Sequence, residues 1–492
     1  MNLDVRSIPY RIFENASRLV GILVLSVVFS TGNGETGGSF DPVQLGIILA
    51  LGLAAAAIWE TAYVKRYEYR ITADTFDISS GVFSRREREI PFERIQNVDI
   101  AQNVVQRGFG IAEVRLETAG GGDTEARLRY VSRREATRLQ ELISDRKRGV
   151  TEREPATETE NVLFELDGNE LAILGFTSAN FNLLGLILFL FFALGSPVAA
   201  SQVSPRLGVL LLLGPVFAVA ALIALWILSG IQAVLRYYGF RLVRQEDELR
   251  YQRGLLQQYN GTIPLSKVQT LMIRENVLAR AVGYGNLVIE TAGYAPGQGS
   301  DSVESAVPIA KRDRLFELAR TIENVGDVEF TRPPKRARTR YVARYTIVVG
   351  VLVAILGGLH LVTDDLQYWY LGAAVWLLVF PAAHLKWKQL GYYYDDNYVV
   401  TRSGFWTRRT TIVPYFRVQT VSDSQTVFQR RRGLATLLVD TASSGGFWGG
   451  DATALDIDVA EARTLRETVH DRFRTALCER QARRASDRPR TT

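Results

Sequence analysis

The feature that most constrains this chain is a short motif that occurs three times. The stretches IPFERIQNVDI (90–100), IPLSKVQTLMI (263–273) and VPYFRVQTVSD (413–423) share a proline, a basic residue three positions later and a glutamine two positions after that. A glycine lies ten residues before each proline, and an acid followed by Thr-Ala lies twenty-one residues after each glutamine. Agreement at so many fixed offsets indicates an internal triplication, so we expect three similar units.

Eight positions in each copy carry the repeat. They are a turn glycine, the proline, the basic residue, the glutamine, an arginine eleven residues further on, a second glycine, and the acid with its threonine. We expect them mainly to serve the fold, because glycine and proline shape turns and a buried amide needs hydrogen-bond partners. The residues are Gly81, Pro91, Arg94, Gln96, Arg107, Gly110, Glu117, Thr118, Gly254, Pro264, Lys267, Gln269, Arg280, Gly283, Glu290, Thr291, Gly404, Pro414, Arg417, Gln419, Arg430, Gly433, Asp440 and Thr441.

A ligand-binding interpretation of the motif stays open beside the structural one. In that alternative Arg94, Lys267 and Arg417 would contact a ligand next to a recognition amide. The glutamine shares a strand face with apolar residues such as Val98 and Leu271, which favours a buried, structural amide. The arginine eleven residues later is expected to pair with the repeated acid of its own unit, with phosphate binding as the alternative.

Each unit is predicted to be a small antiparallel β-sandwich or barrel closed by a helix. Alternating apolar and polar residues with Gly, Asp and Asn between them are typical of hairpins. Asn103, Asn276 and Thr426 are expected to N-cap a short helical turn that the second glycine ends. Amphipathic helices are predicted at the end of each unit. They cover 132–147, 310–322 and 461–477.

Six apolar stretches approach the roughly 20 residues that a membrane-spanning helix needs. They cover 19–31, 43–64, 171–200, 207–235, 345–362 and 368–385. Short loops without Lys or Arg join them into three pairs. We therefore predict a multi-pass α-helical membrane protein with three transmembrane hairpins and three soluble α+β domains. The alternative for the first pair is a buried pair of core helices in a soluble protein.

The distribution of basic residues predicts the orientation. Lys and Arg lie before the first and fifth stretches and after the second and sixth, so the positive-inside rule places these flanks in the cytoplasm. Both termini and all three soluble domains should share that side. The predicted boundaries are 17–64 hairpin 1, 65–149 domain 1, 150–170 linker, 171–235 hairpin 2, 236–325 domain 2, 326–341 basic linker, 342–388 hairpin 3, 389–478 domain 3 and 479–492 disordered basic tail.

A hairpin followed by a β-rich unit bearing IPFERIQNV, RGFG and LETAG resembles the bacterial pleckstrin-homology-like (bPH2) domain of prokaryotic membrane proteins. The three-unit arrangement, with ELAILGFTSANF at 170–181, is similar to the YdbT-like group of that family. The resemblance implies a PH-like fold, a bent β-sandwich with a C-terminal helix. It also implies pairing with a smaller single-domain membrane relative, and a role in envelope maintenance or antimicrobial-peptide defence. It implies no catalytic residue.

A basic cluster beside the fifth apolar stretch is the strongest candidate for lipid contact. Near an anionic leaflet each basic residue contributes roughly 1 kcal/mol of attraction. The alternative is an ordinary positive-inside flank that needs no particular lipid. The cluster consists of Arg332, Lys335, Arg336, Arg338, Arg340 and Arg344.

The chain shows no pattern that indicates catalysis. HExxH, GxSxG and Walker A sequences are missing, and the single cysteine, Cys478, excludes a disulfide framework and a cysteine metal site. We expect no enzyme activity, cofactor or metal. Nucleic acid is not an expected partner, because the net charge of +6 is modest and suits a membrane surface at least as well.

The predicted function is therefore a non-catalytic scaffold or recognition protein for a partner membrane protein, anionic lipid or both. Homo-oligomers are compatible with the sequence. The alternative is a transporter or lipid-moving machine whose hairpins form a path gated by the soluble domains. Nearly uncharged interiors of the apolar stretches, and small-residue runs such as LGLAAAA, favour helix packing over an ion path.

Overall fold

The structure is a computed structural model, and it is described in ten segments. These are residue 4 and residues 6–12, 42–118, 126–148, 161–178, 214–291, 306–323, 325–363, 369–442 and 452–486. The chain forms two compact bodies. The first contains Met1–Val162 and Tyr238–Pro264, and the second contains Leu163–Tyr237 and Leu265–Thr492. The second repeat contributes strands to both bodies.

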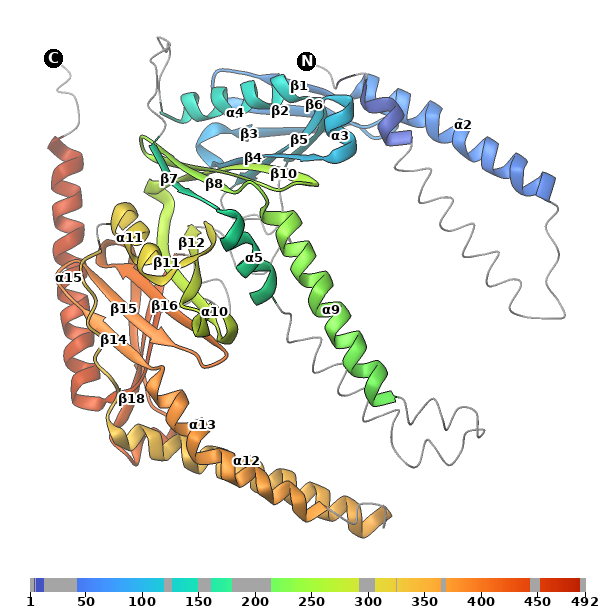
Figure 1. The fold of residues 1–492 in the computed structure, drawn as a ribbon. Coiled ribbons are helices and arrows are strands. Elements are labelled where there is room, and N and C mark those ends of the chain that lie inside the picture. Colours follow the sequence, from blue (N-terminus) through green and yellow to red (C-terminus); the bar gives the residue numbers. More distant parts are fainter. Residues whose placement is uncertain are drawn as a thin grey trace. The chain divides into compact units, whose positions relative to one another are not determined.

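The first repeat consists of two three-stranded antiparallel arrays and a closing helix (Figure 1). One array has the order β1-β2-β3, and β6-β5-β4 belongs to a larger sheet. The elements are α2 (Pro42–Arg66), β1 (Glu68–Ile71), β2 (Thr75–Ser80), β3 (Arg86–Pro91), η1 (Phe92–Arg94), β4 (Ile95–Asn103), α3 (Val104–Phe109), β5 (Ile111–Thr118), β6 (Ala126–Ser132) and α4 (Arg133–Arg148).

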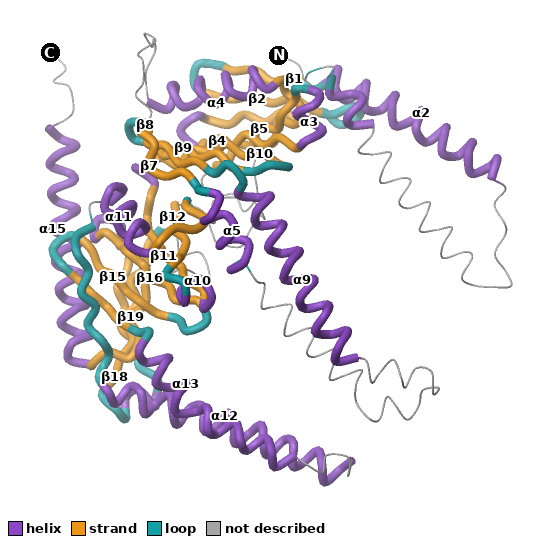
Figure 2. The backbone as a smooth tube through the Cα atoms, in the orientation of Figure 1, coloured by secondary structure: helices purple, strands orange, loops and turns teal. Residues whose placement is uncertain are grey.

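The larger sheet of the first body includes strands from the second repeat. Its order is β6-β5-β4-β10-β9-β8-β7. The added strands are β7 (Asn161–Glu165), β8 (Arg241–Gln245), β9 (Glu248–Arg253) and β10 (Gln257–Pro264). Figure 2 shows the orange strands β4 and β10 side by side within this sheet.

The second body repeats this plan with the remaining strands. One sheet has the order β13-β12-β11-β16-β15-β14, and another has the order β17-β18-β19. The strands are β11 (Val268–Asn276), β12 (Tyr284–Thr291), β13 (Val307–Lys311), β14 (Gly391–Tyr394), β15 (Tyr398–Ser403), β16 (Thr407–Pro414), β17 (Val418–Ser424), β18 (Leu434–Thr441) and β19 (Ala452–Asp458). The helices are α5 (Gly168–Thr177), α9 (Gly214–Tyr237), η2 (Leu265–Lys267), α10 (Val277–Ala281), α11 (Arg312–Glu323), α12 (Lys335–Thr363), η3 (Trp369–Val375), α13 (Trp376–Lys388), η4 (Tyr415–Arg417), α14 (Val427–Arg430) and α15 (Val459–Ser486).

The predicted closing helices pack on their repeats through the apolar residues of their amphipathic faces. In α4, Leu139 and Ile143 are buried in a core that also contains Phe76, Leu116 and Leu128. The equivalent helix α15 buries Leu465 and Val469. Burying a side chain of this size stabilises the fold by about 1.5–3 kcal/mol, so each closing helix fixes the sandwich beneath it.

The prediction of three transmembrane hairpins is wrong. Among the described residues only Lys335–Val362 forms a helix long and apolar enough to cross a membrane, and the architecture is sheet-rich with PH-like β-sandwiches. The predicted sixth segment divides into η3 and the 13-residue α13. A helix of that length spans about 20 Å, short of a hydrocarbon core of about 30 Å. Segment 19–31 and most of 171–200 lie outside the described residues.

Candidate functional site

The repeated motif forms the corner at which the chain passes from one sheet to the next. Pro91, Pro264 and Pro414 are the last residues of β3, β10 and β16. One turn of 3₁₀ helix follows and carries the basic residue, and the next strand then contains the glutamine. Proline suits the end of a strand because it has no backbone N–H to donate to a neighbouring strand. The corner therefore delivers the two strands of each repeat to different sheets.

Neighbouring repeats are joined edge to edge by antiparallel strand pairing. In the first joint β4 of the first repeat pairs with β10 of the second, with Asn103 opposite Gln257 and Ile100 opposite Asn260. In the second joint β11 of the second repeat pairs with β16 of the third, with Asn276 opposite Thr407. We call these two contacts the strand joints.

Both strand joints have the same register. In each, the residue seven positions after the motif glutamine lies opposite the residue seven positions before the next motif proline. Ile273 faces Thr410 in the second joint just as Ile100 faces Asn260 in the first. Register is set by which side chains a strand must bury, so an identical offset indicates one interface used twice.

The repeated arginine donates a hydrogen bond across each strand joint. Nη2 of Arg107 donates to the carbonyl oxygen of Leu255 at 2.6 Å, and Nη1 of Arg280 donates to that of Phe405 at 3.1 Å. Leu255 and Phe405 each follow the turn glycine of the next repeat. Both of these nitrogens thus contact a main-chain carbonyl of the next repeat. We call this contact the arginine clamp. The side chain of Glu117, the acid expected to pair with Arg107, lies outside the described residues.

A buried ion pair lies inside the second joint, in the body of the sheet. Arg408 donates to both carboxylate oxygens of Glu275, from Nε at 2.7 Å and from Nη2 at 2.6 Å. The two side chains are 9% and 2% exposed. A bidentate pair of this geometry adds directional specificity to the register. Glutamines occupy the equivalent positions of the first joint, where Gln258 faces Gln102.

Removing the arginine clamp should loosen the second joint. We expect Arg280→Met to destabilise the β11–β16 pairing by about 1.5 kcal/mol, because a charge-assisted hydrogen bond is lost and the Phe405 carbonyl loses its donor. Hydrogen-exchange mass spectrometry of the full chain in detergent would detect faster exchange in β11 and β16. Arg430→Met is the matched control, since β17 pairs with no strand of another repeat within the described part of the chain. Equal protection in Arg280→Met and the native chain would contradict the clamp.

The short helix that follows each joint strand holds a preceding helical segment. Its predicted N-caps are confirmed, with Asn103, Asn276 and Thr426 accepting from the backbone three residues on. The Nδ2 group of Asn103 also donates to the Tyr10 hydroxyl at 2.7 Å, and that of Asn276 donates to the Thr177 carbonyl at 2.8 Å. One amide thus caps its own helix and fixes a second segment.

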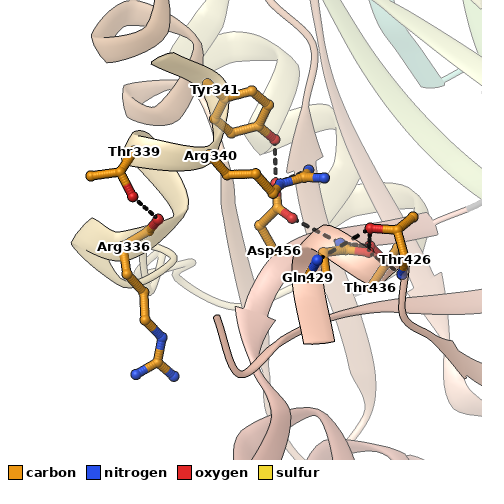
Figure 3. A network of polar contacts seen from close by, with 8 residues as sticks. All are labelled: Arg336, Thr339, Arg340, Tyr341, Thr426, Gln429, Thr436 and Asp456. Atoms are coloured by element: carbon orange, nitrogen blue, oxygen red, sulfur yellow. Dashed lines mark hydrogen bonds and ion pairs between the residues drawn. The ribbon is translucent and has the colours of Figure 1, made fainter. Parts of the chain in front are cut away.

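In the third repeat a buried aspartate fixes the second helical segment, because Thr426 has no side-chain amide. Asp456 is fully buried in β19 and has a positive φ of 59°. One of its oxygens accepts from Arg340 and from the hydroxyl of Tyr341, and the other accepts from Nε2 of Gln429 at 2.8 Å (Figure 3). This network joins the start of α12 to α14 and β19, so we call it the α12 anchor.

The six predicted lipid-contact residues divide into two groups. Arg336 and Arg340 form ion pairs with Asp458 and Asp456, and Arg338 lies over the Phe380 ring at 5.3 Å. These three face protein groups. Arg332, Lys335 and Arg344 are exposed. Within the part of the chain that the structure describes, only the second group can meet a lipid headgroup without breaking an ion pair or a ring contact.

The exposure of a motif residue depends on whether its strand takes part in a strand joint. Gln269 is buried and donates to the Lys267 carbonyl at 3.4 Å, whereas Gln419 on the outer strand β17 is exposed. Nη2 of Arg417 reaches the Leu265 carbonyl of the preceding repeat at 3.4 Å, whereas Arg94 of the first repeat is exposed. The side chains of Gln96 and Glu117 lie outside the described residues.

Sequence reasoning missed Glu275, Arg408 and Asp456. A usable signal existed for the first two, because residues of opposite charge lie six positions after one motif glutamine and six positions before the next motif proline. Asp456 gave no such signal. Its role depends on a bulge in β19 between the partners of Ala435 and Leu437, which spacing alone does not reveal.

Comparison with known proteins finds the same three repeats. The bacterial PH domain family model matches three ranges, 20–147, 189–325 and 344–473. The chain is similar to the UPF0699 transmembrane protein YdbT of Bacillus subtilis (strain 168), with 28% identity over 459 residues that cover 86% of this chain and 88% of the relative. No solved structure matches significantly. The chain belongs to the bacterial PH domain family and carries three copies of that domain.

Proposed function

We propose that this protein is a non-catalytic membrane scaffold, in which bacterial PH domains recognise a partner membrane protein and anionic lipid. The observation that carries the proposal is the α12 anchor. It fixes a helix long and apolar enough to cross a membrane to the core of the third domain through the buried Asp456. The name of the Bacillus subtilis relative, a transmembrane protein, supports membrane insertion.

We further propose that the third domain lies on the cytoplasmic side. The first residues of α12 are rich in Arg and Lys, whereas its last turns hold none. Basic residues collect at the cytoplasmic end of a membrane helix. Envelope maintenance or defence against antimicrobial peptides is the physiological setting that the family resemblance supports.

The strand joints support a recognition role. Main-chain pairing across a sheet edge is a general way for one protein to bind another, with affinity from the backbone and specificity from alternate side chains. This chain uses that interaction twice within itself. A scaffold that assembles its own domains in this way is chemically equipped to receive a further strand.

Binding to anionic lipid is tested with the full chain in nanodiscs, through three exposed bases: Arg332 just before α12, and Lys335 and Arg344 within it. Replacing Arg332, Lys335 and Arg344 together by Gln should reduce phosphatidylglycerol enrichment around the protein, because each base contributes about 1 kcal/mol near an anionic surface. The measurement is the ratio of phosphatidylglycerol to phosphatidylcholine retained in the disc. The matched control replaces Arg133, Arg134 and Arg138 of α4, which are also exposed.

Two outcomes would contradict the lipid part of the proposal. One is equal phosphatidylglycerol retention by the native chain and the Arg332, Lys335 and Arg344 variant. The other is an equal loss in the α4 control, which would reduce the effect to net charge. Saturable solute flux through proteoliposomes, instead of lipid enrichment alone, would favour a transporter.

A further inference from the structure

The outer edge of β17 is the half of a strand joint that has no partner among the described strands. The strand occupies the same place in the third domain as β4 and β11 do in the first and second, yet it lies at the end of its sheet. Its sibling β11 is buried along almost its whole length, whereas Gln419, Thr420, Ser422 and Ser424 of β17 are exposed. An exposed edge offers unpaired backbone donors and acceptors to a further strand.

The arginine clamp of this edge is also unfilled. Arg430 lies eleven residues after its motif glutamine, as Arg107 and Arg280 do. It is exposed, and its guanidinium makes no hydrogen bond or ion pair within the described part of the chain. In both internal joints this arginine donates to the carbonyl oxygen that follows the turn glycine of the next repeat. The third domain therefore presents a strand edge and a clamp in the arrangement that two joints already use.

We propose that the outer edge of β17 binds the corresponding edge strand of a bacterial PH domain on a separate polypeptide, in the register of the two internal joints. The inference rests on the proposed scaffold function and specifies its protein partner. Arg430 donates to the carbonyl that follows the turn glycine of that partner domain. Ser422 lies opposite the third residue before the partner's motif proline, as Met272 lies opposite Thr411.

A second copy of this chain is a poor occupant, for two reasons. Among the described strands, the complementary edge that it leaves unpaired is that of β3. There the clamp acceptor, the Val82 carbonyl, already accepts from Nη1 of Arg66 at 2.6 Å. The joint register would also place Asp423 directly opposite Glu87. Like charges in opposite positions destabilise strand pairing. The internal joints have isoleucine opposite a neutral residue there.

The same positions define the chemistry of the partner strand. It must keep the carbonyl after its turn glycine available, which requires that it lack a counterpart of Arg66. It must also place a neutral or basic residue four positions before its motif proline, where it meets Asp423. Asp423 already forms an ion pair with Arg466 of α15, so a neutral hydroxyl or amide suits that place as well as a base.

Site-specific photo-crosslinking in native membranes tests the register. The photoreactive residue p-benzoylphenylalanine replaces Ser422 in the full chain, and a second variant carries it at Ser424, five positions after the motif glutamine. We expect each to link to a polypeptide that contains a bacterial PH domain, at the third and fifth residues before its motif proline. The probe at Glu87 of β3 is the control, and it should give no linkage in that register.

The clamp is tested in the same membranes. Arg430→Met should lower the crosslink yield from Ser422 about tenfold, because a charge-assisted hydrogen bond is lost. Arg431→Met, which removes the adjacent exposed arginine, should leave the yield unchanged. Equal yields in the two variants would overturn the clamp.

Three results would overturn the docking proposal. They are linkage from Ser422 to Arg88 of a second copy, linkage to a protein without a bacterial PH domain, and no linkage from either probe. The lipid-retention experiment does not depend on β17. Its success together with a failed crosslink would therefore reject this inference and leave the scaffold proposal standing.

Discussion

Glu275→Ala is expected to cost the second compact body about 3–5 kcal/mol of unfolding free energy, since breaking a buried ion pair leaves one charge without its partner. Arg408 would keep its burial and lose both hydrogen bonds to the carboxylate. The measurement is the urea midpoint of the full chain in detergent, together with hydrogen exchange in β11 and β16.

The surroundings of Glu275 increase the expected effect. Burial, followed by the charges of Arg408 and Arg312, lowers the pKa of Arg402 to about 10. Burial and Arg408 also lower the pKa of Arg280, whereas Glu275 raises it. Nε of Arg312 lies 3.7 Å from the same carboxylate. One acid thus compensates a cluster of arginines, and its removal leaves their mutual repulsion unopposed.

A double variant separates the ion pair from simple packing. Glu275→Leu with Arg408→Met should recover most of the lost stability, because well-packed apolar residues replace a buried pair at little cost. Glu87→Ala is the surface control, and it should leave the midpoint unchanged because the Arg85–Glu87 pair is largely exposed. A double variant as unstable as Glu275→Ala would show that the pair is not the source of the effect.

Gly404→Ala is expected to destabilise the third domain by about 3 kcal/mol, through a backbone conformation that suits only glycine. Gly404 has a φ of +93°, and an added Cβ would lie 2.0 Å from the Thr407 carbonyl oxygen. The collision is with backbone, so the turn itself must move. The next residue, Phe405, carries the clamp acceptor, and the substitution should therefore also weaken the bond from Arg280.

Gly283→Ala is the matched control for Gly404→Ala. Gly283 also has a positive φ, of +77°, but an added Cβ there meets no atom within 4 Å. We expect a smaller cost of about 1–2 kcal/mol, from the left-handed backbone alone. A double-mutant cycle of Gly404→Ala with Arg280→Met should show non-additive destabilisation, since the two changes act on one contact. Additive costs would mean that the turn and the clamp are independent.

The repeat and its local structure could be predicted from the sequence. Turn glycines at positive φ, N-caps at Asn103, Asn276 and Thr426, and apolar positions on the closing helices all follow from short-range rules. Such rules depend on residues within one or two turns of each other. They are therefore visible in spacing, and the triplication supplied three examples of each.

The strand joints could not be predicted in the same way. Periodicity shows which face of a strand is buried, but the partner along its edge is a long-range choice. β11 pairs with a strand more than a hundred residues later, and only Glu275 and Arg408 hinted at it. The length of the apolar stretches misled the prediction of transmembrane hairpins. The sixth stretch begins with a 3₁₀ segment, so the α-helix that follows is short.

The shared register of the two joints has a consequence for how such a chain could grow. Each repeat carries one complementary half-interface before its motif proline and the other after its motif glutamine, at the same offset. A gene segment that encodes one whole repeat therefore encodes everything needed to append another. Tandem duplication would lengthen the array without inventing a new contact, and later charge changes at the two ends would then determine where it stops.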